Sequence, residues 1–197
     1  MGMSARECLS SGDDVLNASA LVVGPRDGAG ALLMDLAREL GFGRVERYRG
    51  LTSAERLAET TPLLFFLCAA VPDVQTLRPT AETVRYASNP TVRFAPLIYF
   101  THDPSVATIR PCVQMGFDDV IALPFVAGDL RARLARQVER QLVYYETSTY
   151  FGPDRRIGAR ETPGPTAGQF RRIEIIRRLA SGIDVMTGGE QVEQFEV

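Results

Sequence analysis

The chain has 197 residues, of which 45% are hydrophobic and 23% are charged. This length suits one domain of ordinary size with an appendage, and a formal net charge of −2 argues against a broad surface for nucleic acid or for membranes. All 22 basic residues are arginine, which excludes any mechanism that needs a lysine ammonium group.

The three cysteines, Cys8, Cys68 and Cys112, show no paired spacing, so the sequence predicts neither a disulfide framework nor a zinc site. We expect reduced thiols and a cytoplasmic location, because disulfides are rare in reducing compartments. The longest apolar stretch, residues 63–71, is far shorter than the roughly 20 residues that cross a bilayer. The sequence therefore predicts no membrane span.

The first elements follow a polar leader. Residues 1–17 carry no sustained periodicity, and we expect them to be flexible. A short apolar run ends at Gly24, and leucines at helical spacing then continue to Gly41, which predicts a strand followed by a helix. A second strand is expected at residues 45–48. The sequence Thr-Ser-Ala-Glu that begins at Thr52 is typical of a capping box at the start of a second helix.

Three further strands are expected, each followed by a helix. Residues 63–68 are apolar throughout, as in a parallel strand that is covered on both faces, and residues 95–101 form a second run of buried character. Helices are predicted between Pro79 and Ser88 and from Asp103 to Gly116, the second kinked or late in starting because Pro111 lies inside it. A fifth strand is expected at residues 119–123.

The last predicted helix is long, because Leu130, Leu134, Val138 and Leu142 step by four over about 18 residues. Five strands that alternate with five helices indicate an α/β fold with a doubly wound five-stranded parallel sheet. Residues 18–149 form this domain. Residues 150–197 form a linker and a C-terminal arm, in which residues 170–186 favour a β-hairpin that needs a surface on which to dock.

The order of elements and several local sequences together resemble the receiver domain of bacterial response regulators. The resemblance covers roughly residues 18–142. It rests on the strand and helix that end at Gly41, on the Val71-Pro72 pair, on the Met-Gly-Phe sequence from Met115 and on the Leu-Pro-Phe sequence from Leu123. It implies a receiver-like (βα)5 fold and a cis peptide bond between Leu123 and Pro124.

The same resemblance implies where the phosphorylation site of a receiver would lie. The acidic pair falls on Gly24 and Pro25, the phospho-acceptor aspartate on Cys68, the switch hydroxyl on Thr101 and the conserved lysine on Leu123. Mg²⁺ requires hard oxygen ligands, and the three carboxylates that would supply them are missing. We therefore expect a degenerate receiver without aspartyl phosphorylation, metal or other cofactor.

Two pairs of residues near this edge are candidates for a role in the pocket. Cys68 and His102 would end adjacent strands, which invites a thiolate–imidazole pair, although a buried inert cysteine and an exposed loop histidine are the ordinary interpretation. Arg26 either faces Asp73 and mimics a neutralised site or is a solvated surface arginine. We expect no enzymatic activity.

The partner surface is expected on the face of the fourth helix, fifth strand and fifth helix, and along the extension of the last helix. Five residues mark it: Pro111, Val138, Leu142, Tyr144 and Tyr145. The end of this helix has nothing evident to cover, so we expect a homodimer through the helix and the arm.

The arm also contains arginines that suit a phosphate ligand. Arg155 and Arg156 follow Gly-Pro-Asp, and Arg156 and Arg160 have a spacing similar to half of the cyclic-di-GMP motif of PilZ domains. The second half of that motif is missing.

The sequence thus predicts a phosphorylation-independent, receiver-like adaptor that binds a protein partner in a bacterial two-component or related pathway. The alternative is a cyclic-di-GMP effector that binds its ligand through the arm. An enzyme built on Cys68 and His102 ranks third.

Overall fold

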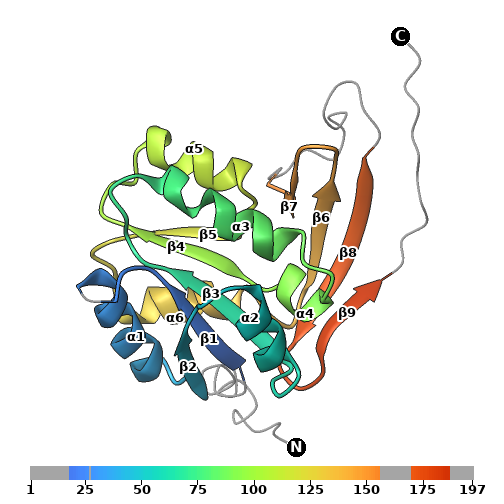
Figure 1. Cartoon of the computed structure of the whole chain (residues 1–197), viewed down its shortest axis with the longest axis horizontal. Helices are drawn as coiled ribbons and strands as arrows, with labels where there is room; N and C mark the ends of the chain where they lie inside the picture. The colour runs from blue at the N-terminus through green and yellow to red at the C-terminus, as the bar shows by residue number, and fades with distance from the viewer. Residues whose placement is uncertain (1–17, 27, 156–169, 187–197) are drawn as a thin grey trace, which may run out of the picture.

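The computed structural model describes residues 18–26, 28–155 and 170–186, and shows two β-sheets side by side (Figure 1). The larger sheet is surrounded by helices, and the smaller one is formed by the C-terminal part of the chain. The predicted leader, residues 1–17, and Cys8 within it lie outside the described residues.

The larger sheet has five parallel strands in the order β2-β1-β3-β4-β5. Their bounds are β1 Ala18–Val23, β2 Arg44–Arg47, β3 Leu63–Cys68, β4 Leu97–Thr101 and β5 Asp119–Ala122. Every residue of β1, β3 and β4 is buried, as expected of central strands that are covered on both faces. The doubly wound parallel sheet predicted from the sequence is confirmed, and its order is that of flavodoxin-like folds.

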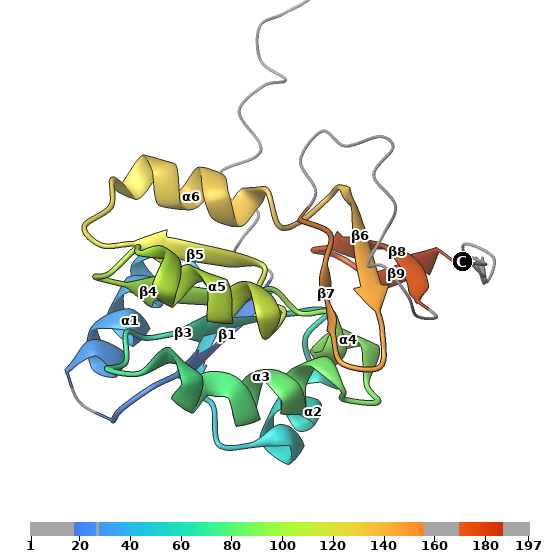
Figure 2. The ribbon, with the colours of Figure 1, turned by 90° about the horizontal axis from the view of Figure 1, so that it is seen from above.

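Helices cover both faces of this sheet. They are α1 Ala29–Glu39, α2 Leu51–Ala58, α3 Arg78–Arg85, the single-turn α4 Pro90–Arg93, α5 Val106–Gln114 and α6 Ala127–Ala135, with the 3-10 helix η2 at Val74–Leu77. One apolar cluster joins α1 and α6 to the sheet, and a second cluster joins α2, α3 and α5 to the opposite face. Figure 2 shows α6 and α3 on opposite sides of the strands.

The start of helix α2 differs from the sequence expectation, whereas the late start of α5 agrees with it. Helix α2 begins at Leu51 after Gly50, without a side-chain cap, and the Ser53 hydroxyl donates to the Gly50 carbonyl at 2.7 Å. The predicted capping box at Thr52 is therefore wrong. Helix α5 begins only at Val106, because the Asp103 carboxylate accepts hydrogen bonds from Ser105 and Thr108 and holds the residues before the helix in a turn.

The long last helix was also predicted wrongly. Helix α6 ends at Ala135, Glu139 adopts a left-handed backbone conformation with φ of 53°, and Gln141–Glu146 form strand β6. Residues far along the sequence stabilise this turn. The Glu139 amide donates to the carbonyl of Arg177 at 2.8 Å, and the Glu139 carboxylate accepts from the amide of Leu179 at 2.8 Å. Contacts with the C-terminal arm thus outweigh the helical periodicity.

The smaller sheet is antiparallel with the order β7-β6-β8-β9. It adds β7 Phe151–Pro153, β8 Arg171–Arg178 and β9 Gly182–Met186 to β6. The predicted C-terminal hairpin is confirmed as β8 and β9. The hairpin pairs with β6, a strand that lies within the predicted domain of residues 18–149. The C-terminal arm and the end of that domain therefore form one sheet.

The two sheets meet at points where their backbones come very close. A Cβ atom on Gly152 would lie 2.7 Å from the Cα atom of Gly116, and one on Gly116 would lie 2.2 Å from the carbonyl oxygen of Phe151. Gly116 also has a φ of 78°, which favours glycine. Larger residues at these positions would push the small sheet away from the large one.

Within the described part of the chain, no helix has both the length and the apolar character needed to cross a membrane.

Candidate functional site

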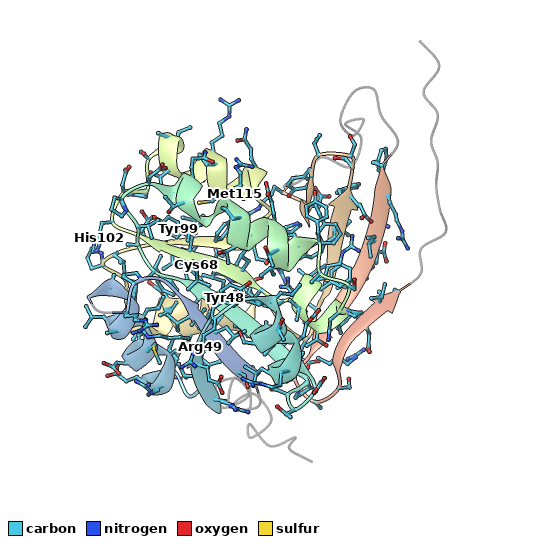
Figure 3. The ribbon with its side chains drawn as sticks, in the orientation of Figure 1. Tyr48, Arg49, Cys68, Tyr99, His102 and Met115 are labelled. Carbon is cyan, nitrogen blue, oxygen red and sulfur yellow. The ribbon has the colours of Figure 1, made fainter. Side chains whose placement is uncertain are left out.

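The carboxyl ends of the parallel strands bring together the positions that resemble a receiver phosphorylation site. The register pairs Val23 with Cys68, Cys68 with Tyr99, and Thr101 with Ala122, so Gly24, Cys68, Thr101 and Leu123 share this edge (Figure 3 labels Cys68). The Leu123–Pro124 peptide bond is cis, as the resemblance implied. No group of three or more potential metal ligands occurs among the residues that the structure describes.

The position of the missing acidic pair is also closed by packing. A Cβ atom built on Gly24 would lie 2.8 Å from the Cβ atom of Ala69, and Gly24 has a φ of 154°. The next loop residues are held by Arg47, whose guanidinium donates to the carbonyls of Pro25, at 2.6 Å, and of Arg26. A carboxylate at Gly24 would require this part of the edge to move.

Cys68 and His102 lie on opposite faces of the sheet. Cys68 is 1% exposed and packs in the apolar cluster with α2 and α3. His102 lies two residues after Phe100, and because side chains alternate between the two faces, both lie on the α1 side. Burial raises the pKa of the Cys68 thiol far above its usual range, and burial likewise raises the pKa of Cys112 to about 11. The structure therefore forms no thiolate–imidazole pair at these two residues (Figure 3).

The pocket candidates Arg26 and Asp73 are not joined by an ion pair among the described residues. Asp73 caps η2, because its carboxylate accepts from the amide of Gln75 at 2.9 Å. Arg26 is exposed. Thr101, predicted as the position of a switch hydroxyl, is 3% exposed, and its hydroxyl hydrogen-bonds the backbone of Asp103 at 3.0 and 3.1 Å. It thus stabilises the turn before α5.

An apolar cavity of about 480 Å³ opens at this edge on the α1 face. Helix α1, the loop after β3, the end of β4 and the turn after β5 each contribute to its walls. Its lining consists of Ala29, Leu32, Leu33 and Leu36 from α1, Ala69 and Ala70 after β3, Phe100 from β4, His102 just after β4, and Leu123, Pro124 and Phe125 after β5. Of the three predicted pocket residues, only His102 lies here.

A buried ionic cluster joins the two sheets. Asp118, whose side chain is 1% exposed, accepts from Arg85 at 2.5 Å and from Arg177 at 2.6 Å. The Tyr144 hydroxyl donates to the same carboxylate at 2.5 Å and accepts from Arg177. Because Arg177 belongs to β8 and Arg85 to α3, one carboxylate on the large sheet holds an arginine from each side of the junction.

The remaining guanidinium hydrogens of this cluster point at carbonyl oxygens. Arg85 donates to Gly116 at 2.8 Å and to Ala95 at 2.9 Å, and Arg177 donates to Phe94 at 2.8 Å. Such pairing is necessary, because a buried charge without partners is very costly. The aromatic rings of Phe94, Tyr144 and Phe151 pack around the cluster with centroids 5.4–5.6 Å apart.

The Asp118 carboxyl has a depressed pKa. Burial raises this pKa, but the charges of Arg177 and Arg85 and the hydrogen bonds to the carboxylate outweigh burial and lower it from 3.8 to about 2. A group with a lowered folded-state pKa stabilises the fold above its unfolded-state pKa and loses that contribution as the pH falls toward the folded value. At about 1.36 kcal/mol per pKa unit, the contribution is on the order of 2 kcal/mol.

We therefore expect the stabilising effect of Asp118 to fade between about pH 4 and pH 2. The free energy of unfolding in urea, measured on the wild type and on Asp118→Ala, should differ most above pH 5. The difference should narrow by roughly 2 kcal/mol toward pH 2.5. A difference that stays constant across this window would contradict the depressed pKa.

Of the three arginines predicted as ligand candidates in the arm, the structure describes one. Arg155 is exposed, donates to the carbonyl of Phe117 and lines a polar cavity of about 290 Å³ together with Arg140, Gln137 and Asp154. Arg156 and Arg160 lie outside the described residues. The predicted ligand site of three arginines can therefore be examined only at Arg155.

Of the five residues predicted to mark the partner or dimer surface, two are buried and three are half-buried. Tyr144 is fully buried and Val138 is 8% exposed, while Leu142 and Tyr145 are half-buried in β6. These four residues come after the end of α6, so the helical surface that was predicted is wrong. Pro111 is half-buried in α5.

Sequence reasoning missed the residues of the ionic cluster. Asp118 and Arg85 carry no motif, since charged side chains of this kind are ordinarily solvated. The one available signal was Arg177, at an inward position of a strand whose alternate residues Ile173 and Ile175 are apolar.

Comparison of the sequence with models of known protein families and with curated proteins gives no match.

Proposed function

We propose that the chain is a receiver-like signalling protein that acts by binding a protein partner, without phosphorylation. The observation that carries this proposal is the composition of the carboxyl edge, where Gly24, Pro25, Cys68 and Leu123 stand at the positions that would hold carboxylates and lysine. The close approach of Gly24 to Ala69 supports it further, because an aspartate has no room at that position.

The partner surface that we propose is the face formed by α5, β5 and α6. Strand β5 is an edge strand of the larger sheet, and three of its four residues are only half-buried. Val106 at the start of α5 is 77% exposed and Val126 before α6 is 67% exposed, which places large apolar side chains on this side of the molecule. Exposed apolar groups of this kind are frequent at protein interfaces.

Two measurements test this proposal. Calorimetry with Mg²⁺ and beryllium fluoride should give no binding heat, whereas stoichiometric uptake would contradict a phosphorylation-independent protein. Co-purification from the native cell should give a partner whose yield falls at least about tenfold with Val106→Asp, and not with Val185→Asp on β9. A partner retained equally by both variants would contradict the proposed face.

The alternative function is binding of cyclic di-GMP. It is favoured by one observation, the presence of Arg140 and Arg155 at the same polar cavity, because guanidinium groups suit phosphate oxygens. Calorimetry on the full chain distinguishes the two functions. The alternative predicts one-site binding that is lost in Arg155→Ala, and the adaptor function predicts no heat.

A further inference from the structure

The apolar cavity at the carboxyl edge has the dimensions of a small-molecule site. Its volume of about 480 Å³ lies within the roughly 300–1,000 Å³ that ligand pockets span. It is concave and is bounded by four separate elements, at the edge where open α/β sheets bind their ligands. Of the positions that resemble the receiver phosphorylation site, Leu123 lines the cavity and Gly24, Cys68 and Thr101 do not, so the cavity lies beside that site and shares only one of its positions.

Small side chains keep this space open. Ala29, Ala69 and Ala70 line the cavity where longer aliphatic residues would fill it, and Leu32 at the mouth stays 70% exposed. Apolar surface left in water favours burial by about 25 cal/mol per Å². An apolar molecule in the cavity would therefore be stabilised by surface that the free protein leaves uncovered.

We propose that this cavity binds a neutral, apolar organic molecule, such as a ring system or a short acyl chain, with its polar group near His102. Among the described residues of the lining none carries a charged side chain, so a charged ligand would lose its hydration without gaining a partner from them. His102 is the one described lining residue whose side chain has polar atoms, and an imidazole can form hydrogen bonds through both ring nitrogens.

This inference does not depend on the proposed adaptor function. A protein partner is less well suited to this cavity, because interfaces between proteins are broad surfaces with a polar rim, whereas this space is a concave, apolar pocket between α1, the end of β4 and the loops after β3 and β5. Partner capture through Val106 and ligand binding at the cavity can therefore succeed or fail separately.

The test uses the neutral fluorophore N-phenyl-1-naphthylamine, titrated into the full-length chain. We expect a saturable increase in fluorescence with one site per chain. Ala70→Leu narrows the cavity from the β3 side and should weaken probe binding at least tenfold. The matched control is Ala132→Leu, the same change at an exposed position of α6 outside the cavity, which should bind as the wild type does.

A second variant, Ala29→Leu, narrows the cavity from the α1 side and keeps the test valid if Ala70→Leu fails to fold, as judged by circular dichroism. Loss of probe binding in either folded variant, with binding retained in Ala132→Leu, supports the site. Absence of saturable binding to the wild type, or wild-type affinity in the folded cavity variants, would overturn the proposal.

Discussion

Replacement of Asp118 with alanine is expected to lower the free energy of unfolding by about 3–5 kcal/mol. The carboxylate is the shared acceptor for Arg85, Arg177 and the Tyr144 hydroxyl, and its side chain is 1% exposed. Removing it leaves two guanidinium groups buried with carbonyl oxygens as their main partners. Urea unfolding followed by circular dichroism measures the loss.

The matched control is Asp184→Ala in the same chain. Asp184 pairs with Arg178 at 2.5 Å, but the two side chains are 47% and 44% exposed, so solvent screens this pair and Asp184→Ala should lower the free energy of unfolding far less than Asp118→Ala does. If the two alanine variants lost the same small amount of stability, the cluster at Asp118 would not hold the two sheets together as described.

Truncation of Ile175 to alanine is expected to lower the free energy of unfolding by about 2–5 kcal/mol. Ile175 is fully buried on the inner face of β8 and packs with Phe94 and Tyr144 at the junction of the sheets. The loss should appear in one transition for the whole chain, since Phe94 belongs to the α/β part and Ile175 to the small sheet. Thermal unfolding followed at two wavelengths measures the loss of stability and the number of transitions.

The neighbouring residue provides the control. Ile176 points to the other face of β8 and is only half-buried, so Ile176→Ala should cost less than half as much. Two separate transitions, with only the second shifted by Ile175→Ala, would show that the small sheet unfolds independently and would contradict a shared core.

The shared core changes how the arm can be studied. A chain that ends at Thr149 would lack Arg177 and the inner face of β8, leaving Asp118 with one arginine and Tyr144 uncovered. Binding measured on such a chain would confuse loss of a ligand site with loss of the fold. Single substitutions at Arg155 or Ala70 avoid this problem.

The parallel sheet could be predicted because its three central strands are largely apolar runs. In the runs at 18–23, 63–68 and 97–101 both faces of the strand are largely apolar, so both faces need to be covered. The stretches between the runs are long enough for crossover helices. The hairpin at β8 and β9 was also predicted from local sequence, because a stretch rich in β-branched residues and arginine precedes a Ser-Gly turn.

The last helix could not be predicted from spacing alone. Leu130, Leu134 and Val138 do lie in the core, but the apolar step to Leu142 crosses a turn into β6. The sequence Leu-Val-Tyr-Tyr has high strand propensity, and this signal competed with the helical period. The outcome depended on β8, which is some thirty residues further along the chain.

The sequence by itself determined the α/β architecture and the absence of lysine, because both follow from residue types and their local order. Only the tertiary structure decided that β6 leaves the helical pattern, that Arg85 and Arg177 converge on Asp118, and that an apolar cavity borders His102. These features join residues far apart in sequence, and their energies depend on burial and on partner geometry, which local patterns do not encode.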